Sequence, residues 1–429
     1  MNIVFHTLGC KVNQYETQCM REAFESKGFT VVSEDSPFDV AVLNSCTVTS
    51  ESDRKTRQLL NRLRRQNENA VIVLTGCMAQ TFSGDKSEIS NADIIVGNKD
   101  LSKITDLVQQ FLKDRMKIFD ITPHERYEYF NTPLISDFAE RTRAYIKIED
   151  GCDRYCSYCI IPYARGFVRS KPIEEIRKEA ETLSKKGFSE IVLVGINLSA
   201  YGKGEDINLC DAVCAVAEIE GIKRVRLGSL EPDHISDSML LRFKAEEKFC
   251  PQFHLSLQSG CDETLKRMNR HYDSKFYADL VYRIRKMFPD SSITTDIMVG
   301  FAGESQEEFE KSVAFLKEIG FAKAHVFAYS RRKGTVADRL PNQITKTEKS
   351  RRSRIMIEAA NECEQKILNS QIGKTVEVLF ETKENGLVFG YTKNYIRVGV
   401  KTDLSLEGKT ADVKIISVVN DYCVGELSL

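Results

Sequence analysis

The sequence has no hydrophobic run approaching the roughly 20 residues that a membrane-spanning helix needs. The opening residues lack the basic segment and long apolar stretch of a secretory signal peptide, so we expect a cytoplasmic protein without membrane association. Neither charge is in excess, because 61 basic and 62 acidic residues give a formal net charge of −1. This balance excludes a global attraction to polyanions, so a nucleic acid would have to be held by local basic patches.

Histidine is scarce as well. The six histidines show no metal-binding spacing, and no nucleophile–base arrangement can be recognised, which argues against a hydrolase. Cysteine, by contrast, is plentiful, with 13 residues. Disulfides are rare in the cytosol and an odd number of cysteines cannot pair completely, so metal binding or catalysis explains the thiols better.

The length of 429 residues predicts two to four domains at about 150 residues each. In the first part of the chain, short apolar runs alternate with polar, periodic stretches, which predicts an open parallel α/β sheet. Three of these runs lead into cysteines. Ligands gather beyond the carboxyl ends of parallel strands, so these thiols are expected to converge. The runs are residues 2–7 before Cys10, 40–43 before Cys46 and 71–74 before Cys77, with a further strand at 93–96.

The centre of the chain alternates six strand-like runs with helical patterns and predicts a full or partial (β/α)6 barrel, whose chemistry should lie at the carboxyl ends of its strands. The last part has four strand-like runs and predicts a small all-β barrel. We therefore expect four segments: a first domain at 1–115, a linker at 116–143, the barrel at 144–370 and the all-β barrel at 371–429. The central runs are 144–148, 190–196, 224–229, 252–257, 292–299 and 323–329, a charged helix is expected at 346–369, and the terminal runs are 375–380, 387–391, 396–400 and 412–419.

The strongest local signal is a C-x3-C-x2-C loop formed by Cys152, Cys156 and Cys159. Three thiolates can bind three irons of a 4Fe-4S cluster, which leaves the fourth iron open to a substrate or cofactor. Zinc is the alternative, but structural zinc usually takes four ligands in paired form, and no fourth cysteine or histidine lies nearby in the sequence.

This triplet at the head of a β/α series resembles the radical S-adenosylmethionine (SAM) superfamily. The resemblance implies that SAM binds the open iron and that one-electron reduction yields a 5′-deoxyadenosyl radical, with the electron supplied by a donor such as flavodoxin or ferredoxin. Glycines at strand ends would allow close approach of the cofactor, although each could equally form only a tight turn. The residues expected to bind the cofactor are Tyr158, Gly195, Asn197, Glu231, Gln258 and Gly300.

Spacing alone leaves Cys10, Cys46 and Cys77 open to two interpretations, a ligand set or three small buried hydrophobic residues. Their surroundings, Thr-Leu-Gly-Cys-Lys-Val-Asn-Gln, Leu-Asn-Ser-Cys-Thr-Val and Leu-Thr-Gly-Cys-Met-Ala-Gln, resemble the amino-terminal domain of methylthiotransferases. The resemblance implies that these cysteines hold a second 4Fe-4S cluster, whose free iron carries the sulfur that is methylated and transferred.

Within this family, Gly-Cys-Lys-Val-Asn-Gln-Tyr-Glu-Thr at 9–17 is most similar to bacterial threonylcarbamoyladenosine tRNA methylthiotransferases of the MtaB type. Relatives acting on isopentenyladenosine tend to read Gly-Cys-Gln-Met-Asn, and those acting on a ribosomal-protein aspartate read Gly-Cys-Pro-Lys-Asn. The similarity implies that threonylcarbamoyladenosine at tRNA position 37 receives a 2-methylthio group. One SAM would methylate the sulfur, and a second would yield the radical that abstracts the hydrogen from adenine C2.

Two rival interpretations remain, the same chemistry on either of the other substrates and a non-catalytic iron–sulfur RNA-binding protein. The expected partner is the anticodon loop, because proteins read RNA mainly through unstacked bases. The terminal β-barrel resembles a TRAM domain and has aromatic residues on which bases could stack. We expect a monomer. Substrate contacts are expected from Arg165, Arg169, Arg331 and Arg332, although a solvated charge cluster needs no ligand.

Overall fold

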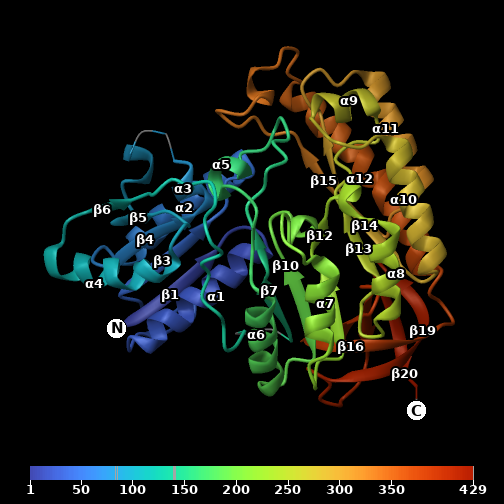
Figure 1. Ribbon diagram of the computed structural model, residues 1–429, viewed down its shortest axis with the longest axis horizontal. Helices are drawn as coiled ribbons and strands as arrows, with labels where there is room; N and C mark the ends of the chain where they lie inside the picture. The colour runs from blue at the N-terminus through green and yellow to red at the C-terminus, as the bar shows by residue number, and fades with distance from the viewer. Residues whose placement is uncertain (83, 85, 139–141, 429) are drawn as a thin grey trace.

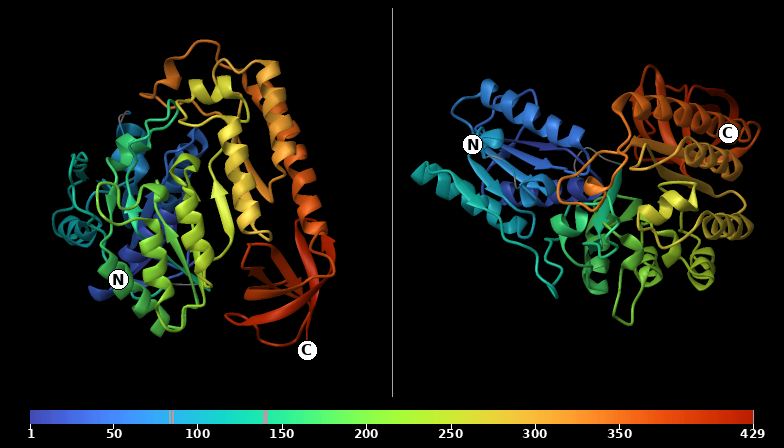
Figure 2. Two further views of the ribbon diagram at one scale, coloured as in Figure 1. Left: turned by 45° about the vertical axis from the view of Figure 1, so that its right-hand side comes forward. Right: turned by 90° about the horizontal axis from the view of Figure 1, so that it is seen from above.

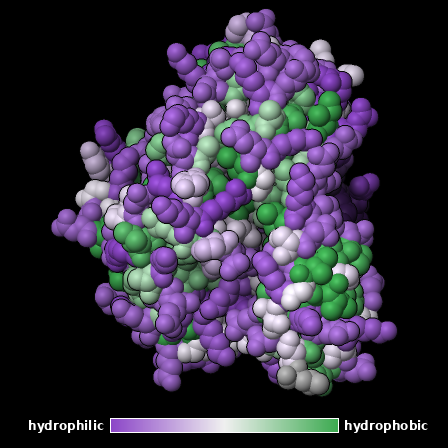
Figure 3. Space-filling view, turned by 90° about the vertical axis from the view of Figure 1, so that its right-hand side faces the viewer, coloured by the Kyte–Doolittle hydropathy of each residue, from purple (hydrophilic) through white to green (hydrophobic). Residues whose placement is uncertain are grey.

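The computed structural model describes residues 1–82, 84, 86–138 and 142–428. Figure 1 shows three regions in chain order: an amino-terminal α/β sheet, a central series of strands and helices, and a carboxy-terminal β-barrel. Among the described residues, no helix is long and apolar enough to cross a membrane. On the face in Figure 3, hydrophobic side chains form patches between hydrophilic ones.

The amino-terminal region is a six-stranded parallel sheet in the order β2-β1-β3-β4-β5-β6. Its central strands are continuous apolar runs because helices cover both faces. Apolar side chains of α1 and α4 form the core on one face, and those of α2 and α3 form it on the other. The elements are β1 (Asn2–Thr7), α1 (Lys11–Ser26), β2 (Thr30–Val31), β3 (Val40–Ser45), α2 (Ser50–Gln66), β4 (Val71–Gly76), α3 (Cys77–Gln80), β5 (Ile94–Val96), α4 (Ile104–Asp114) and β6 (Ile118–Asp120).

The expected linker at 116–143 is wrong at its start. Residues Ile118–Asp120 form β6, which pairs in parallel with β5 as the last strand of the sheet. Strand β6 lies at the edge of the sheet and its residues are partly exposed, so it lacks the buried apolar run that marks β5 in the sequence. We accordingly propose that the first domain extends to residue 120, and we retain the boundaries at 144 and 371 as proposals.

The central region contains all six expected strands, arranged as a partial barrel (Figure 2). Hydrogen bonding divides them into a sheet β11-β10-β7 and a sheet β12-β13-β14-β15, because the third expected strand is interrupted at Gly228. The elements are β7 (Arg143–Lys147), β8 (Glu149–Asp150), α5 (Ile161–Arg165), β9 (Arg169–Ser170), α6 (Ile173–Lys185), β10 (Glu190–Val194), α7 (Leu209–Ala217), β11 (Arg224–Leu227), β12 (Ser229–Leu230), α8 (Asp237–Ala245), β13 (Gln252–Leu255), α9 (Asp262–Arg267), α10 (Ser274–Met287), β14 (Ser292–Val299), α11 (Gln306–Ile319), β15 (Lys323–Ala328) and α12 (Lys346–Asn369).

The carboxy-terminal region is a closed five-stranded barrel in the order β16-β17-β18-β20-β19. The sequence predicted four of its strands and missed β20, which pairs in parallel with β18 and thereby closes the barrel. Val378, Phe380, Val398 and Val413 lie in its core. The strands are β16 (Thr375–Glu384), β17 (Leu387–Thr392), β18 (Arg397–Val400), β19 (Thr410–Val419) and β20 (Tyr422–Leu427).

Helix α1 joins the amino-terminal sheet to the central barrel. Its residues Val12, Tyr15 and Cys19 belong to the same hydrophobic core as the barrel strands, and the Tyr15 hydroxyl donates to Glu179 Oε1 at 2.6 Å. On the other side, the Arg224 guanidinium donates to the Tyr391 carbonyl of the carboxy-terminal barrel at 2.9 Å. These buried contacts hold all three regions around a common cleft.

Candidate cluster and cofactor sites

The first group of thiols lies in the loop after β8. The Cys159 amide donates to the Cys156 carbonyl at 2.9 Å, so the backbone turns tightly between these two thiols. Burial raises the pKa of Cys152 and raises that of Cys159 to about 12. Because the free Cys152 and Cys159 thiols would be neutral at pH 7, they would become thiolates on binding a cation.

Arg270 lies against this loop and is a site residue that sequence reasoning missed. Its Nη1 donates to Cys156 Sγ at 3.1 Å, its Nη2 donates to the Glu231 carboxylate, and the side chain is buried. Glu231 was expected to bind the cofactor, and the structure connects it through Arg270 to a cluster thiol. No motif surrounds Arg270, so only the tertiary contact reveals it.

The second group of thiols lies where three neighbouring strands of the amino-terminal sheet end. Cys10 follows β1 and precedes α1, Cys46 follows β3, and Cys77 begins α3 directly after β4. A Cβ placed on Gly9 would lie 3.1 Å from Cys46 Cβ, which shows how closely these strand ends approach. Burial raises the pKa of Cys77 to about 12, and Cys46 and Cys10 are close enough to contribute to that increase.

The hydrogen bonding of the thiols bears on what they can hold. Among the described residues, no group of three or more His, Cys, Asp or Glu side chains that could hold a metal ion is found. N–H donors face a sulfur of each thiol group: Arg270 faces Cys156, and the Val48 amide lies 3.5 Å from Cys46 Sγ. Such donors stabilise the sulfurs of an iron–sulfur cluster, so the surroundings of both thiol groups fit one.

All four arginines expected to contact substrate have partners within the protein, and the side chains of three of them are largely buried. Arg165 is completely buried and donates to Cys77 Sγ and Glu16, so the expectation that it contacts substrate is wrong. Arg332 donates to Asp53 and to Thr47, beside Cys46. Arg169 lies 3.3 Å from Asp150 and has a largely buried side chain. Arg331 pairs with Asp338 and has an exposed side chain, so it remains open to a ligand.

Two of the expected cofactor residues, Gly195 and Asn197, meet Glu149 at the carboxyl end of β10. The Asn197 amide donates to Glu149 Oε2 at 2.7 Å, and a Cβ on Gly195 would lie 2.6 Å from the same oxygen. Glu149 Oε1 and both polar side-chain atoms of Asn197 are buried without a hydrogen-bond partner among the described residues. Such unpaired groups cost about 1–3 kcal/mol each, and a bound polar molecule would relieve that cost. The site therefore fits a polar cofactor such as SAM.

Tyr158 and Gln258 line a cavity of about 210 Å³ beside Cys159. Gln258 has a φ of 69°, and its backbone amide donates to the Asp296 carbonyl at 2.8 Å. Gly300 also has a φ of 69°, and its amide donates to Glu304 Oε2 at 2.7 Å. A Cβ there would lie 2.4 Å from Lys349 Cγ, so this glycine is required by its turn.

A larger cleft of about 670 Å³ lies between the three regions. Cys10 and Lys11 line it from the amino-terminal sheet, Asp296 from the central barrel, and Tyr391 and Tyr395 from the carboxy-terminal barrel. One thiol of the second group therefore opens onto a space to which every region contributes.

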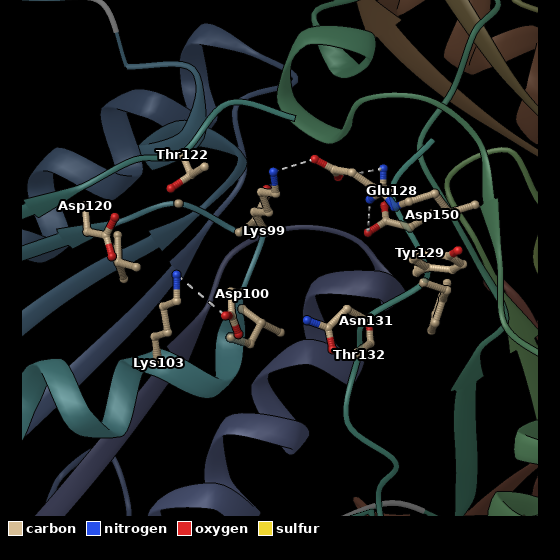
Figure 4. A pocket seen from close by; sticks show the side chains of 16 residues that line it. Lys99, Asp100, Lys103, Asp120, Thr122, Glu128, Tyr129, Asn131, Thr132 and Asp150 are labelled. Carbon is tan, nitrogen blue, oxygen red and sulfur yellow. Dashed lines mark ion pairs between the residues drawn. The ribbon is translucent and has the colours of Figure 1, made fainter. Parts of the chain in front are cut away.

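A third cavity, of about 430 Å³, lies at the end of β5 (Figure 4). Its lysines are paired with carboxylates, Lys99 with Glu128 at 2.6 Å and Lys103 with Asp100 at 3.7 Å. No cluster cysteine is among its lining residues. The cleft at Cys10 is therefore the better candidate for the reaction site.

Comparison with known proteins agrees with this three-part organisation. Residues 2–97 match the Uncharacterized protein family UPF0004, residues 146–316 the Radical SAM superfamily and residues 369–427 the TRAM domain. Among solved structures, the radical SAM methyltransferase TsrM from Kitasatospora setae, with cobalamin and a [4Fe-4S] cluster bound, has a TM-score of 0.56 at 13% identity and covers 76% of this chain and 74% of its own. At that identity the likeness concerns the fold alone.

Curated relatives match almost the whole chain. The threonylcarbamoyladenosine tRNA methylthiotransferases MtaB of Bacillus subtilis and Aquifex aeolicus are each 36% identical, over 99% and 98% of this chain and 96% and 100% of their own lengths. The tRNA-2-methylthio-N(6)-dimethylallyladenosine synthase of Clostridium perfringens is 34% identical over 98% of this chain and 96% of its own. Identity at this level and coverage, together with the two thiol groups and the three matched regions, means that the chain belongs to the radical SAM tRNA methylthiotransferases.

Proposed function

We propose that this enzyme converts N6-threonylcarbamoyladenosine at tRNA position 37 to its 2-methylthio derivative. The cleft between the three regions carries the proposal, because Cys10 and the stacked rings of Tyr391 and Tyr395 line the same space. An unstacked purine could pack against the tyrosines with its edge toward Cys10. The similarity to MtaB enzymes supports the choice of substrate.

We further propose two 4Fe-4S clusters, one held by Cys152, Cys156 and Cys159 and the other by Cys10, Cys46 and Cys77. Together with SAM, they would supply the radical, the methyl group and the sulfur. The protein binds and orients these groups. Asn197 and Glu149 present unpaired polar atoms to the cofactor.

Arginine side chains would hold each cluster in place. Arg270 donates to Cys156 Sγ, and Arg165 donates to Cys77 Sγ. The electron donor, flavodoxin or ferredoxin, and a monomeric state stay part of the proposal.

The same chemistry on isopentenyladenosine, or on a ribosomal-protein aspartate, is the first rival. Mass spectrometry of tRNA nucleosides from a deletion strain distinguishes the substrates. Loss of the 2-methylthio derivative of threonylcarbamoyladenosine alone supports the proposal, whereas its retention contradicts it. Complementation with the Cys152→Ala gene is the control, because that variant should not restore the product.

A non-catalytic iron–sulfur RNA-binding protein is the second rival. Reconstituted enzyme given dithionite and SAM should form 5′-deoxyadenosine, and the Cys156→Ala variant should form none. Absence of 5′-deoxyadenosine from the wild type, with iron present, would favour the non-catalytic alternative.

A further inference from the structure

Three cations line the large cleft: Lys11, Lys323 and Arg397. Two of them are already neutralised. Lys323 Nζ lies 2.8 Å from Glu364 Oε1, and Arg397 Nη2 lies 3.0 Å from Glu384 Oε2.

Lys11 differs from these two cations. In the part of the chain that the structure describes, no carboxylate forms an ion pair or hydrogen bond with its ammonium group, which lies 5.9 Å from the centre of the Tyr145 ring. The residue is only partly exposed. A half-buried charge without a partner is costly, so this position favours an anion from outside the protein.

Two arginines near Lys11 already have carboxylate partners. Arg143 lies 5.1 Å and Arg226 lies 4.8 Å from the centre of the Tyr395 ring, and Arg143 pairs with Glu381 and Arg226 with Glu190. Burial by itself would raise the pKa of the Tyr395 phenol, yet Arg143, Lys11 and Arg226 lower it overall. Helix α1 begins at Lys11 and has no acidic residue in its first turn, so its dipole also favours an anion at this position.

We propose that Lys11 binds the carboxylate of the threonylcarbamoyl group and selects an anionic N6 substituent over a neutral alkyl one. This inference rests on the proposed function. The connectivity of adenine supports it, because C2 and C6 are both bonded to N1 and their substituents lie along one edge of the ring. When C2 faces the thiol group at Cys10, the N6 substituent reaches the adjacent residue, Lys11.

The test compares two anticodon stem-loop RNAs, one with N6-threonylcarbamoyladenosine and one with its threonine methyl ester, which removes the negative charge and adds one methyl group. Wild-type enzyme should bind the acid about tenfold more tightly than the ester, as expected for a charge-assisted hydrogen bond. Lys11→Met should bind both RNAs equally, and Lys11→Arg should retain the preference. Lys323→Met is the matched control from the same cleft, and it should change both affinities by the same factor at constant salt.

Equal binding of acid and ester by wild-type enzyme would overturn the inference. So would a preference that persists in Lys11→Met. Iron per chain is also measured in each variant. If Lys11→Met lost iron, Lys11→Arg regained it and the preference for the acid RNA stayed unchanged, the charge of Lys11 would serve cluster binding, and the inference would be overturned. Failure of the proposed function looks different, because wild-type enzyme would then form no 2-methylthio product on the acid RNA at all.

Discussion

Arg165 Nε donates a hydrogen bond to Cys77 Sγ at 3.2 Å, although the two residues are 88 positions apart in the sequence. Arg165 ends α5, the short helix after Cys159, and its other nitrogens donate to the buried carboxylate of Glu16 in α1. One buried guanidinium thus connects the loop of the first thiol group to a thiol of the second. The same side chain therefore fixes the positions of the two candidate cluster sites relative to each other.

Replacement of Arg165 should strongly destabilise the protein. Arg165→Met leaves Glu16 buried with Lys147 as its remaining cation, and loss of one partner of a buried pair costs roughly 3–5 kcal/mol. Arg177→Met is the control, because its pair with Glu218 lies on the surface and is worth about 0–1 kcal/mol. Urea unfolding of the metal-free proteins measures both, and similar losses in the two variants would contradict the assignment.

The iron content should reveal two clusters. Anaerobically reconstituted wild type should contain about eight irons per chain, with matching acid-labile sulfide, as expected for two 4Fe-4S clusters. Triple replacement of Cys10, Cys46 and Cys77 by alanine should reduce the iron to about four. Mössbauer spectroscopy with sulfide analysis makes the measurement. Unchanged iron in the triple variant would mean that these thiols are core residues.

We expect Arg270 to raise the reduction potential of the first cluster. A hydrogen bond to a ligand sulfur stabilises the more negative, reduced state, so Arg270→Met should lower the reduction potential of the cluster at Cys156. Arg267→Met is the control, because Arg267 pairs with Glu308 at the end of α9 and has no hydrogen bond to a cluster thiol. Redox titration followed by electron paramagnetic resonance reports the potential. An equal potential in wild type and Arg270→Met would show that the contact does not influence the cluster.

We expect Asn197 to lower the stability of the protein without SAM and to strengthen the binding of SAM. Asn197→Leu removes two unpaired buried polar atoms, so the free energy of unfolding should stay equal or increase. SAM affinity should fall about tenfold through loss of polar contacts. Asn98→Leu is the converse control, because Asn98 is buried with hydrogen bonds to Ala164 and His124, and its loss should lower stability alone. Calorimetry with SAM and urea unfolding separate the two effects, and unchanged SAM affinity in Asn197→Leu would contradict this role.

Glu149 should make stability fall as the pH rises. Burial raises the pKa of its carboxyl well above 4.5, the ordinary value it regains on unfolding. Above pH 4.5 the unfolded chain therefore binds fewer protons than the folded one, which lowers the free energy of unfolding. Glu149→Gln removes this dependence, so its stability relative to wild type should increase from pH 5 to pH 8. Urea unfolding of the metal-free proteins across that range provides the test, and a constant difference would refute it.

Much of this molecule could be predicted from the sequence because the signals are local. The C-x3-C-x2-C loop lies within eight residues, and the apolar runs that became β3 and β4 are continuous because helices cover both faces of the sheet. The long helix α12 was predicted with its observed bounds. Local pattern failed where a strand lies partly exposed at the edge of a sheet, as β6 does, or where pairing with a distant strand decides the structure, as in β20.

The partners of the site residues were decided by the tertiary structure. The sequence by itself does not show that Arg270 faces Cys156 or that Arg165 is buried against Cys77. Nor does it show that, among the described residues, Lys11 lacks a carboxylate partner while Lys323 has one. The sequence does not show whether a charged side chain is solvated, paired or unpaired, because pairing depends on which strand ends and helices the fold brings together. The sequence alone thus determined the kind of chemistry, and the packing of the three regions decided which charged side chains support the thiols and which remain accessible to a ligand.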